Sequence, residues 1–186
     1  MAKINNKEPL CSFFRRPVKN TRPHKNVSLS QVYSVIRGRY FVERTASLRE
    51  ITDPKEAREF KAKHFDYCTF SGVFTERKDS ALSSYSGLMC LDFDDLENWA
   101  KTKQDLLGDT NLETMLLFRS PSGTGLKWII RTAANAETHG KYFDAVSQYI
   151  KATYGLEVDK SGRDLSRACF LPHDAFAVLN PEFLPK

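Results

Sequence analysis

The stretch SGLMCLDFDDLENW, residues 86–99, joins an apolar run to a group of carboxylates. Its first half has the composition of a buried strand, and Asp92, Asp94 and Asp95 follow directly. Like charges this close together repel one another unless a cation or a helix terminus offsets them. We therefore predict a strand over residues 88–94 that ends beside a positively charged partner.

The spacing of the first two carboxylates points to metal chemistry. Asp92 and Asp94 are two residues apart, so on a strand their side chains project from the same face. Mg²⁺ takes one or two carboxylates and completes its octahedron with water and substrate phosphates, as in two-metal phosphoryl-transfer centres. The alternative is structural: Asp94 or Asp95 caps the following helix, and Asp92 merely ends a strand.

A second polar group is the small-residue loop RSPSGTGLKW, at residues 119–128, between two apolar stretches. Its small residues allow the backbone to approach a phosphate, and the basic residue at each end supplies positive charge. The loop is not a P-loop, because GxxxxGK[S/T] is absent. A glycine hairpin with solvated neighbours is the alternative. The candidate phosphate-binding residues here are Arg119, Ser122, Gly123, Gly125 and Lys127.

A third polar group is EVDKSGRDLSRACF, at residues 157–170. Asp159 follows an apolar valine and can complete a metal triad with the two carboxylates of the strand. Arg163 and Arg167 can bind triphosphate or template phosphates through bidentate hydrogen bonds. A surface loop with internal ion pairs is the alternative.

Charge is distributed unevenly along the 186 residues, whose net charge is +5. Residues 1–26 hold seven basic residues against Glu8 alone, so this segment carries +6 and the remainder −1. Lysine and arginine neutralise nucleic-acid phosphates and release counterions. We therefore predict that Arg15, Arg16 and Lys19 contact nucleic acid; a solvated arm that aids solubility is the alternative.

Cysteine and histidine spacing excludes several classes of site. The four cysteines and four histidines show no C-x-x-C, H-x-H or H-E-x-x-H pattern, which argues against a zinc hydrolase or a paired-histidine nickase. We interpret the cysteines as reduced core residues. The start, MAKINNKEPL, has no apolar core of signal-peptide length, and nowhere do eighteen apolar residues run together. We expect a cytoplasmic protein that does not contact a membrane.

The predicted helices and strands do not follow strict βαβ alternation, which favours an α+β fold with a largely antiparallel sheet. Hydrophobic periodicity and turn residues predict helices at 28–38, 53–65, 95–108 and 136–153. They predict strands at 9–15, 67–74, 88–94, 114–120, 126–132, near Val158 and around 167–172, with a polar connection at 75–87 and an irregular C-terminal tail.

The order of the three polar groups resembles the archaeo-eukaryotic primase superfamily. More closely, TFSGVFTERK, SGLMCLDFDDL, SPSGTGLKWII and VDKSGRDLSRACFLPHD are similar to the VirE N-terminal domain family, also called the BT4734-like N-terminal domain family. The family is found in primase-helicase-like proteins of bacterial mobile elements. The resemblance implies one domain over residues 9–183, overlapping the basic segment 1–26, with the metal-site motifs in 86–174.

By this resemblance the fold would be a primase-polymerase-like core, an RRM-like sheet flanked by helices, beside a smaller N-terminal αβ unit. Asp92, Asp94 and Asp159 would be catalytic and hold Mg²⁺ or Mn²⁺, and the loop 122–127 would hold a triphosphate. The implied activity is metal-dependent nucleotidyl transfer in DNA replication or mobilisation of a mobile element. Single-stranded or primed DNA and a nucleoside triphosphate would be its substrates, and a helicase-type domain or protein its partner.

One residue departs from the primase pattern. Primases carry a histidine after the serine of the second motif, whereas this chain has Lys127 and no histidine nearby. A lysine neutralises phosphate as a point charge but lacks the geometry of an imidazole. Two alternatives therefore remain open: a catalytically inactive nucleotide- or nucleic-acid-binding module on the same fold, and a two-metal nuclease that uses the same acids.

Overall fold

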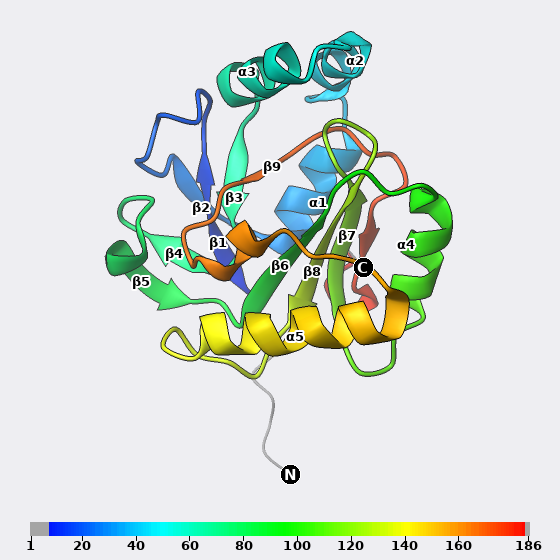
Figure 1. The fold of residues 1–186 in the computed structure, drawn as a ribbon. Helices are drawn as coiled ribbons and strands as arrows, with labels where there is room; N and C mark the ends of the chain where they lie inside the picture. Colours follow the sequence, from blue (N-terminus) through cyan, green and yellow to red (C-terminus); the bar gives the residue numbers. More distant parts are fainter. Residues whose placement is uncertain (1–7, 185–186) are drawn as a thin grey trace.

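The computed structural model describes residues 8–184, which form an α+β fold with five α-helices and three antiparallel sheets (Figure 1). The helices are α1 (Leu29–Arg37), α2 (Val42–Glu50), α3 (Pro54–His64), α4 (Trp99–Leu107) and α5 (His139–Tyr154). The strands are β1 (Leu10–Phe14), β2 (Lys25–Ser28), β3 (Tyr67–Thr69), β4 (Gly72–Phe74), β5 (Leu82–Tyr85), β6 (Leu88–Phe93), β7 (Thr114–Arg119), β8 (Leu126–Arg131), β9 (Cys169–Phe170) and β10 (Val178–Leu179). Short 3₁₀ turns occupy η1 (Asp79–Ala81), η2 (Lys160–Arg163) and η3 (Pro181–Phe183).

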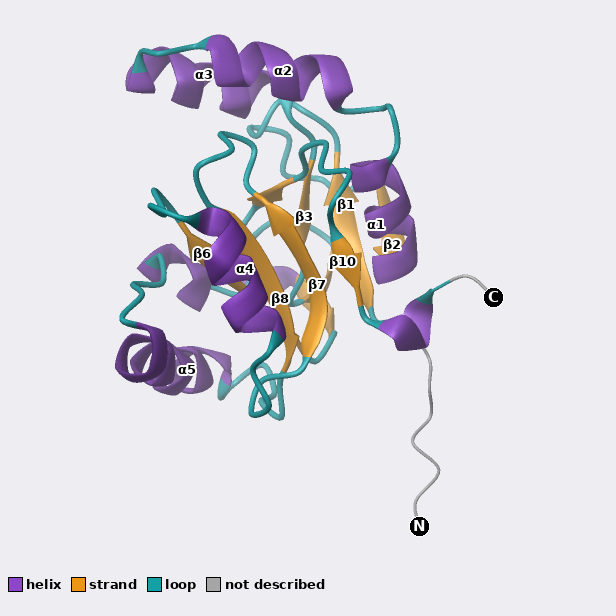
Figure 2. Ribbon diagram, turned by 90° about the vertical axis from the view of Figure 1, so that its right-hand side faces the viewer, coloured by secondary structure: helices purple, strands orange, loops and turns teal. Residues whose placement is uncertain are grey.

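Two four-stranded sheets carry the fold. The first sheet has the order β2-β1-β3-β9, the second sheet has the order β10-β7-β8-β6, and β4 and β5 form a separate pair. Every strand pair is antiparallel, as the sequence predicts. Figure 2 shows α4 and α5 on one side of the second sheet and α1 on the other.

The strand β6 separates two hydrophobic clusters because its side chains alternate between the faces of the sheet. Its odd-numbered side chains pack in a cluster that includes residues of α4 and α5, whereas Leu88 and Cys90 pack with α1 and the first sheet. Asp92 belongs to the same face as Leu88 and Cys90. Its carboxylate therefore points into the space between the two sheets rather than toward α4 and α5.

Two predicted helix starts are confirmed by their caps. The Ser28 hydroxyl accepts a hydrogen bond from the Gln31 N–H (3.4 Å), and the Gln31 side chain accepts one from the Ser28 N–H (3.1 Å), which makes a capping box at α1. At α3, Asp53 caps the Glu56 N–H (2.7 Å) and Pro54 fills the first helical position.

The predicted cap of α4 is wrong. Asp95 adopts a left-handed backbone conformation (φ 49°), which aspartate tolerates better than most residues, and the chain turns there at the end of β6. The side chain of Asn98 caps the helix instead, accepting from the Lys101 N–H (3.0 Å), and α4 begins at Trp99. Asp95 accepts a hydrogen bond from the Thr124 hydroxyl (3.2 Å).

Several short elements also differ from the predictions. The single strand predicted at 67–74 is two strands, β3 and β4, because the chain turns between them, and the predicted polar connection contains β5. No strand forms at Val158; the turn η2 follows instead. The helix α2 and the strands β2 and β10 carry too weak a local pattern to be predicted. The strand β2 pairs with β1, which precedes it, whereas β10 pairs with β7, which is distant in sequence.

Two broader expectations concern the class of the protein. The four cysteines are free, and three of them are buried, as predicted for core residues. Among residues 8–184 no helix combines the length and the apolar character needed to cross a membrane.

Residues 1–7 of the predicted basic segment lie outside the described residues, and the rest of that segment forms β1, the β1–β2 loop and part of β2.

Candidate metal and phosphate site

Three carboxylates from separate parts of the chain converge at one end of β6. Asp92 lies in β6, Asp94 directly follows it, and Asp159 caps the turn η2. One oxygen of each carboxylate lies within 4.8 Å of the other two. The Asp159 N–H donates to the main-chain oxygen of Asp92 (2.9 Å), which holds the two segments together. The structure thus brings together the acids that the sequence places in two distant motifs.

Asp92 is the buried member of the group, with 8% of its surface exposed. Lys127 lies directly opposite it in the β6–β8 register, and the lysine ammonium forms an ion pair with Asp92 Oδ2. The other oxygen, Oδ1, is buried and has no hydrogen-bond partner among the described residues. A buried carboxylate oxygen without a partner is costly, so Oδ1 is the atom of this site most in need of a cation.

The charges of the site depend on one another. Burial raises the pKa of the Asp92 carboxyl, as do the charges of Asp94 and Asp159, while Lys127 opposes the rise. Burial lowers the pKa of Lys127, but the charge of Asp92, its hydrogen bond with Asp92 and the neighbouring Cys169 and Cys90 together raise it by more, so the net pKa is raised. Lys127 therefore remains a cation. Although burial opposes it, hydrogen bonds from Ser161 and the charge of Arg167 lower the pKa of Asp159, which remains an anion.

Positively charged side chains line the same space as the carboxylates. A cavity of about 190 Å³ contains the three acids together with Lys61, Arg77, Lys127 and Arg167. A wider cavity of about 450 Å³ adjoins it, shares Lys61, Asp94 and Asp159 with it, and adds Arg58 and Ser122. Carboxylates and cations therefore face one volume, which suits a divalent cation bound beside a polyanion.

Lys61 reaches the site from α3, which lies with α2 over one end of the second sheet (Figure 2). Its ammonium lies 5.9 Å from the centre of the Phe170 ring, and burial lowers its pKa. Sequence reasoning missed Lys61, Arg58 and Arg77. Two of them lie on a helix rich in charged residues, where a lysine or arginine ordinarily belongs to a solvated face, so no local signal distinguishes them.

The small-residue loop between β7 and β8 is held rigidly against the end of β6. A Cβ on Gly125 would clash with the carbonyl oxygen of Phe93, and Gly123 has φ 85°, so both positions require glycine. The Ser120 hydroxyl accepts from the Gly125 N–H (3.0 Å), which closes the loop. This arrangement places Ser122 in the wider cavity beside Asp94 and Asp159.

Two arginines predicted to bind phosphate have other partners. The Arg119 guanidinium lies 4.2 Å from the centre of the Trp99 ring and donates to the Gly123 carbonyl. Arg163 pairs with Asp144 on α5 (3.0 Å). Neither lines the two cavities, whereas Arg167 lines the smaller one and pairs with Asp159 (3.1 Å).

The basic residues predicted to bind nucleic acid lie apart from the acids. Arg15, Arg16 and Lys19 are exposed on the loop between β1 and β2. None of them lines the two cavities, but Val18 on the same loop lines the smaller one. The loop therefore borders the site without contributing a charge to it.

A known protein family matches the part of the chain that contains the site. The family model described as BT4734-like, N-terminal domain, matches residues 59–178, a range that contains all three acids, the small-residue loop and Lys61. No curated protein and no solved structure matched the chain.

Proposed function

Because the chain belongs to the BT4734-like N-terminal domain family, and because its acids and cations face one cavity, we propose that it is a primase-polymerase-like domain. Its reaction would be metal-dependent nucleotidyl transfer in replication or mobilisation of a mobile element. The observation that carries the proposal is the carboxylate trio, whose ligand oxygens lie within 4.8 Å of one another. The buried Oδ1 of Asp92, which has no hydrogen-bond partner among residues 8–184, supports the proposal, because a bound cation would satisfy it.

Each charged group has a role in this proposal. Asp92, Asp94 and Asp159 supply hard oxygen ligands, which fit Mg²⁺ or Mn²⁺. Such ions, when bound, activate an attacking 3′ hydroxyl and stabilise a leaving pyrophosphate. Lys61 and Arg167 face the same cavity and would hold the triphosphate of the incoming nucleotide.

The proposal extends to the fold and the partners. The second sheet with α4 and α5 would be the RRM-like core of a primase, and the first sheet with α1 would be the smaller αβ unit. Single-stranded or primed DNA would be the template, with a helicase-type domain or protein acting on the same DNA.

A specific observation favours a second candidate, a nucleotide- or nucleic-acid-binding module without turnover. Lys127 stands where primases carry a histidine, and its ammonium pairs with Asp92 Oδ2. A lysine so placed neutralises part of the carboxylate charge that catalytic metals require. The module would bind a nucleoside triphosphate through the same cations without transferring its nucleotidyl group.

Metal binding is tested by thermal unfolding with and without Mn²⁺. Asp94 is exposed and forms no ion pair within the described residues, so Asp94→Asn should fold normally, whereas Asp92→Asn would leave Lys127 without its partner. We expect Mn²⁺ to raise the melting temperature of the wild type and to have much less effect on Asp94→Asn. The matched control, Asp95→Asn, makes the same charge change at the next residue and should retain the wild-type response. Equal responses of wild type and Asp94→Asn would overturn the metal site.

The reaction itself is tested by extension of an annealed primer on a single-stranded template with Mn²⁺ and nucleoside triphosphates. Extension by the wild type and by Asp95→Asn, but not by Asp94→Asn, is the expected result. Calorimetry that shows cooperative binding of Mn²⁺ and triphosphate without extension would select the binding module. Metal-dependent cleavage of the strand would select the two-metal nuclease.

A further inference from the structure

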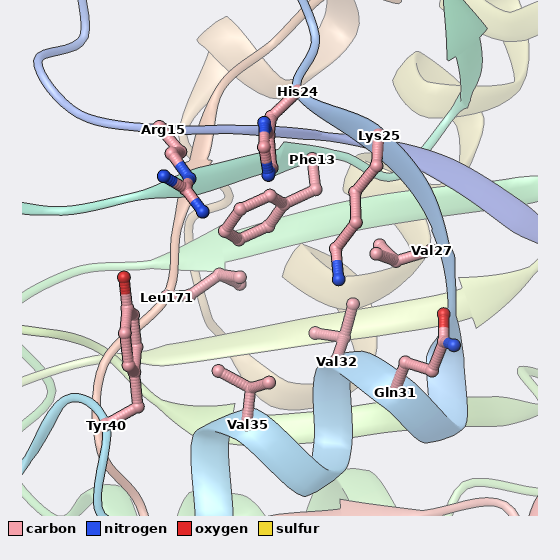
Figure 3. A pocket seen from close by; sticks show the side chains of 10 residues that line it. All are labelled: Phe13, Arg15, His24, Lys25, Val27, Gln31, Val32, Val35, Tyr40 and Leu171. Atoms are coloured by element: carbon pink, nitrogen blue, oxygen red, sulfur yellow. The ribbon is translucent and has the colours of Figure 1, made fainter.

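A separate cavity of about 270 Å³ lies between the first sheet and α1 (Figure 3). Phe13 on β1 and Lys25 on β2 are direct partners in the antiparallel register, so their side chains project from the same face of the sheet. Val32 and Val35 of α1 face them across the cavity. Tyr40, which follows α1 and is 53% exposed, stands at the rim.

This cavity is distinct from the carboxylate site. It shares no lining residue with either of the two cavities around the acids. Leu171 lines it, whereas the preceding residue, Phe170, lines the carboxylate cavity, and neighbouring side chains of an extended chain project in opposite directions. The β1–β2 loop connects the two places, because Arg15 and His24 at its ends line this cavity and Val18 within it lines the other.

The rim of the cavity is positively charged and its floor is apolar. Arg15, His24 and Lys25 line it, and no carboxylate does. Residues 9–42, which supply every lining residue except Leu171, contain seven lysines and arginines and no aspartate or glutamate. Neither Arg15 nor Lys25 forms an ion pair within the described part of the chain. The positive charges of Arg15 and Lys25 are therefore available to bind the anionic group of a ligand.

We propose that this cavity binds one base of a single-stranded nucleic acid, with the flanking phosphates on Arg15 and Lys25; the inference rests on the proposed function. A base has two apolar faces and can stack on Phe13 or Tyr40, and stacking of this kind tolerates any sequence. Arg15 from the β1–β2 loop and Lys25 from β2 reach the cavity on either side of Phe13 (Figure 3). That spread suits a backbone that crosses the cavity with a phosphate on each side of the base.

The course of the β1–β2 loop supports a strand rather than a small apolar anion. A fatty acid would satisfy one cation with its single carboxylate. A strand that leaves the cavity along this loop would meet the exposed residues Arg16 and Lys19 before it reaches the carboxylate site. The basic residues of the cavity and of the loop would therefore lie along such a strand on its way to the acids.

The test compares a single-stranded oligonucleotide with an abasic sugar-phosphate strand of equal length by fluorescence anisotropy. We expect the wild type to bind the base-containing strand about 5- to 150-fold more tightly, the range for stacking of one base. Val35→Phe fills the cavity without changing charge, so it should abolish most of this preference and leave the salt dependence unchanged. The matched control, Val42→Phe, makes the same substitution at an exposed residue that does not line the cavity, and should bind as the wild type does.

Two further variants keep the test decisive if Val35→Phe does not fold. Tyr40→Ala truncates an exposed rim residue and should reduce the preference for the base-containing strand. Lys25→Gln removes one phosphate contact, so log affinity should fall less steeply with log salt, by about 0.7 in the slope. Equal affinity of the wild type for both strands would overturn the proposal, as would an undiminished preference in a folded Val35→Phe and in Tyr40→Ala. Binding of laurate that Val35→Phe abolishes, with oligonucleotide binding unaffected, would assign the cavity to a lipid instead. Asp94→Asn should retain the base preference, so failure here and failure of the metal site are distinguishable.

Discussion

Lys127 is the residue on which the charge balance of the carboxylate site depends. Because it follows the small-residue loop, the sequence predicts that Lys127 contacts phosphate. In the structure, Lys127 on β8 pairs with Asp92 on the neighbouring strand β6. The side chains of Lys127 and Asp92 are only 11% and 12% exposed. The lysine therefore serves as a counter-ion of Asp92 within the protein.

This pairing predicts a large stability effect at one residue. Lys127→Met should lower the free energy of unfolding by about 3–5 kcal/mol, because it leaves a buried carboxylate without its partner. Urea unfolding with an unchanged m-value measures the loss. The double variant Lys127→Met/Asp92→Asn should recover most of it, since neither charge is then left alone. A loss below about 1 kcal/mol, as for surface ion pairs, would contradict this account.

The acids of the site could be predicted from sequence, but most of its cations could not. Asp92 and Asp94 are marked by strand alternation, which is a local property. Lys61 reaches the site only because α3 packs over the end of the second sheet, and that placement depends on contacts distant in sequence. Arg119 and Arg163 were expected to bind phosphate, and their partners, Trp99 and Asp144, lie roughly twenty residues away along the chain.

At the scale of elements, the start of α4 shows how a plausible cap can be displaced by a few residues. Asp95 and Asn98 both have side chains that can cap a helix, and the sequence alone gives no reason to prefer the second. The chain turns at Asp95 because it must pass from β6 to α4 against the small-residue loop, where Thr124 donates to the Asp95 carboxylate. Only then does the helix begin.

This assignment predicts different costs for substitutions at Asn98 and at Asp95. Asn98→Ala removes the acceptor for the Lys101 N–H and should lower the free energy of unfolding by about 1 kcal/mol. Asp95→Gly, which removes the carboxylate and keeps a residue tolerant of the left-handed conformation, should change stability by less than about 0.5 kcal/mol. Chemical denaturation of both variants measures the difference. A larger loss for Asp95→Gly than for Asn98→Ala would restore Asp95 as the cap.

Elements with a strong local pattern could be predicted, and elements defined by distant pairing could not. The antiparallel pair β7 and β8 has an apolar run on each side of a turn, and α1 has a capping box and a regular apolar face. The strand β10 has only two residues, and its pairing of Val178 with Leu117 joins positions about sixty residues apart. Nothing within such a short segment distinguishes it from a loop.

At the scale of the whole molecule, one region of the fold mixes acids with cations, and another holds cations without acids. The acids gather between the sheets at the end of β6, whereas the acid-free stretch 9–42 forms β1, β2, α1 and the cavity between them. A polyanion is attracted to the second region, and at the end of β6 it would meet the cations of the carboxylate cavity as well as the acids. On the proposed function, a strand bound in the acid-free region would have its end at the carboxylates.

The packing of α5 against the rest of the fold predicts a dependence of stability on pH. His139, the first residue of α5, is only 2% exposed and its Nδ1 lies 2.9 Å from the Tyr85 hydroxyl of β5. Burial lowers the pKa of His139, although a hydrogen bond with the Gly162 backbone and the charge of Asp79 oppose the shift. The folded protein therefore holds this histidine neutral at a pH where the unfolded chain protonates it.

The sign of the effect follows from proton linkage. Below about pH 6.5, the ordinary value for histidine, the unfolded state binds a proton that the folded state does not, so the free energy of unfolding falls as the pH decreases. The slope for one proton is at most about 1.4 kcal/mol per pH unit, and it ends once the pH drops below the folded-state pKa. Urea unfolding between about pH 5 and 7.5 should show a shallower slope for His139→Gln than for the wild type, because glutamine binds no proton in either state. Identical slopes for the two proteins would mean that His139 has the same pKa in the folded and unfolded states. The contacts of α5 with β5 and η2 would then not favour the neutral form of this histidine.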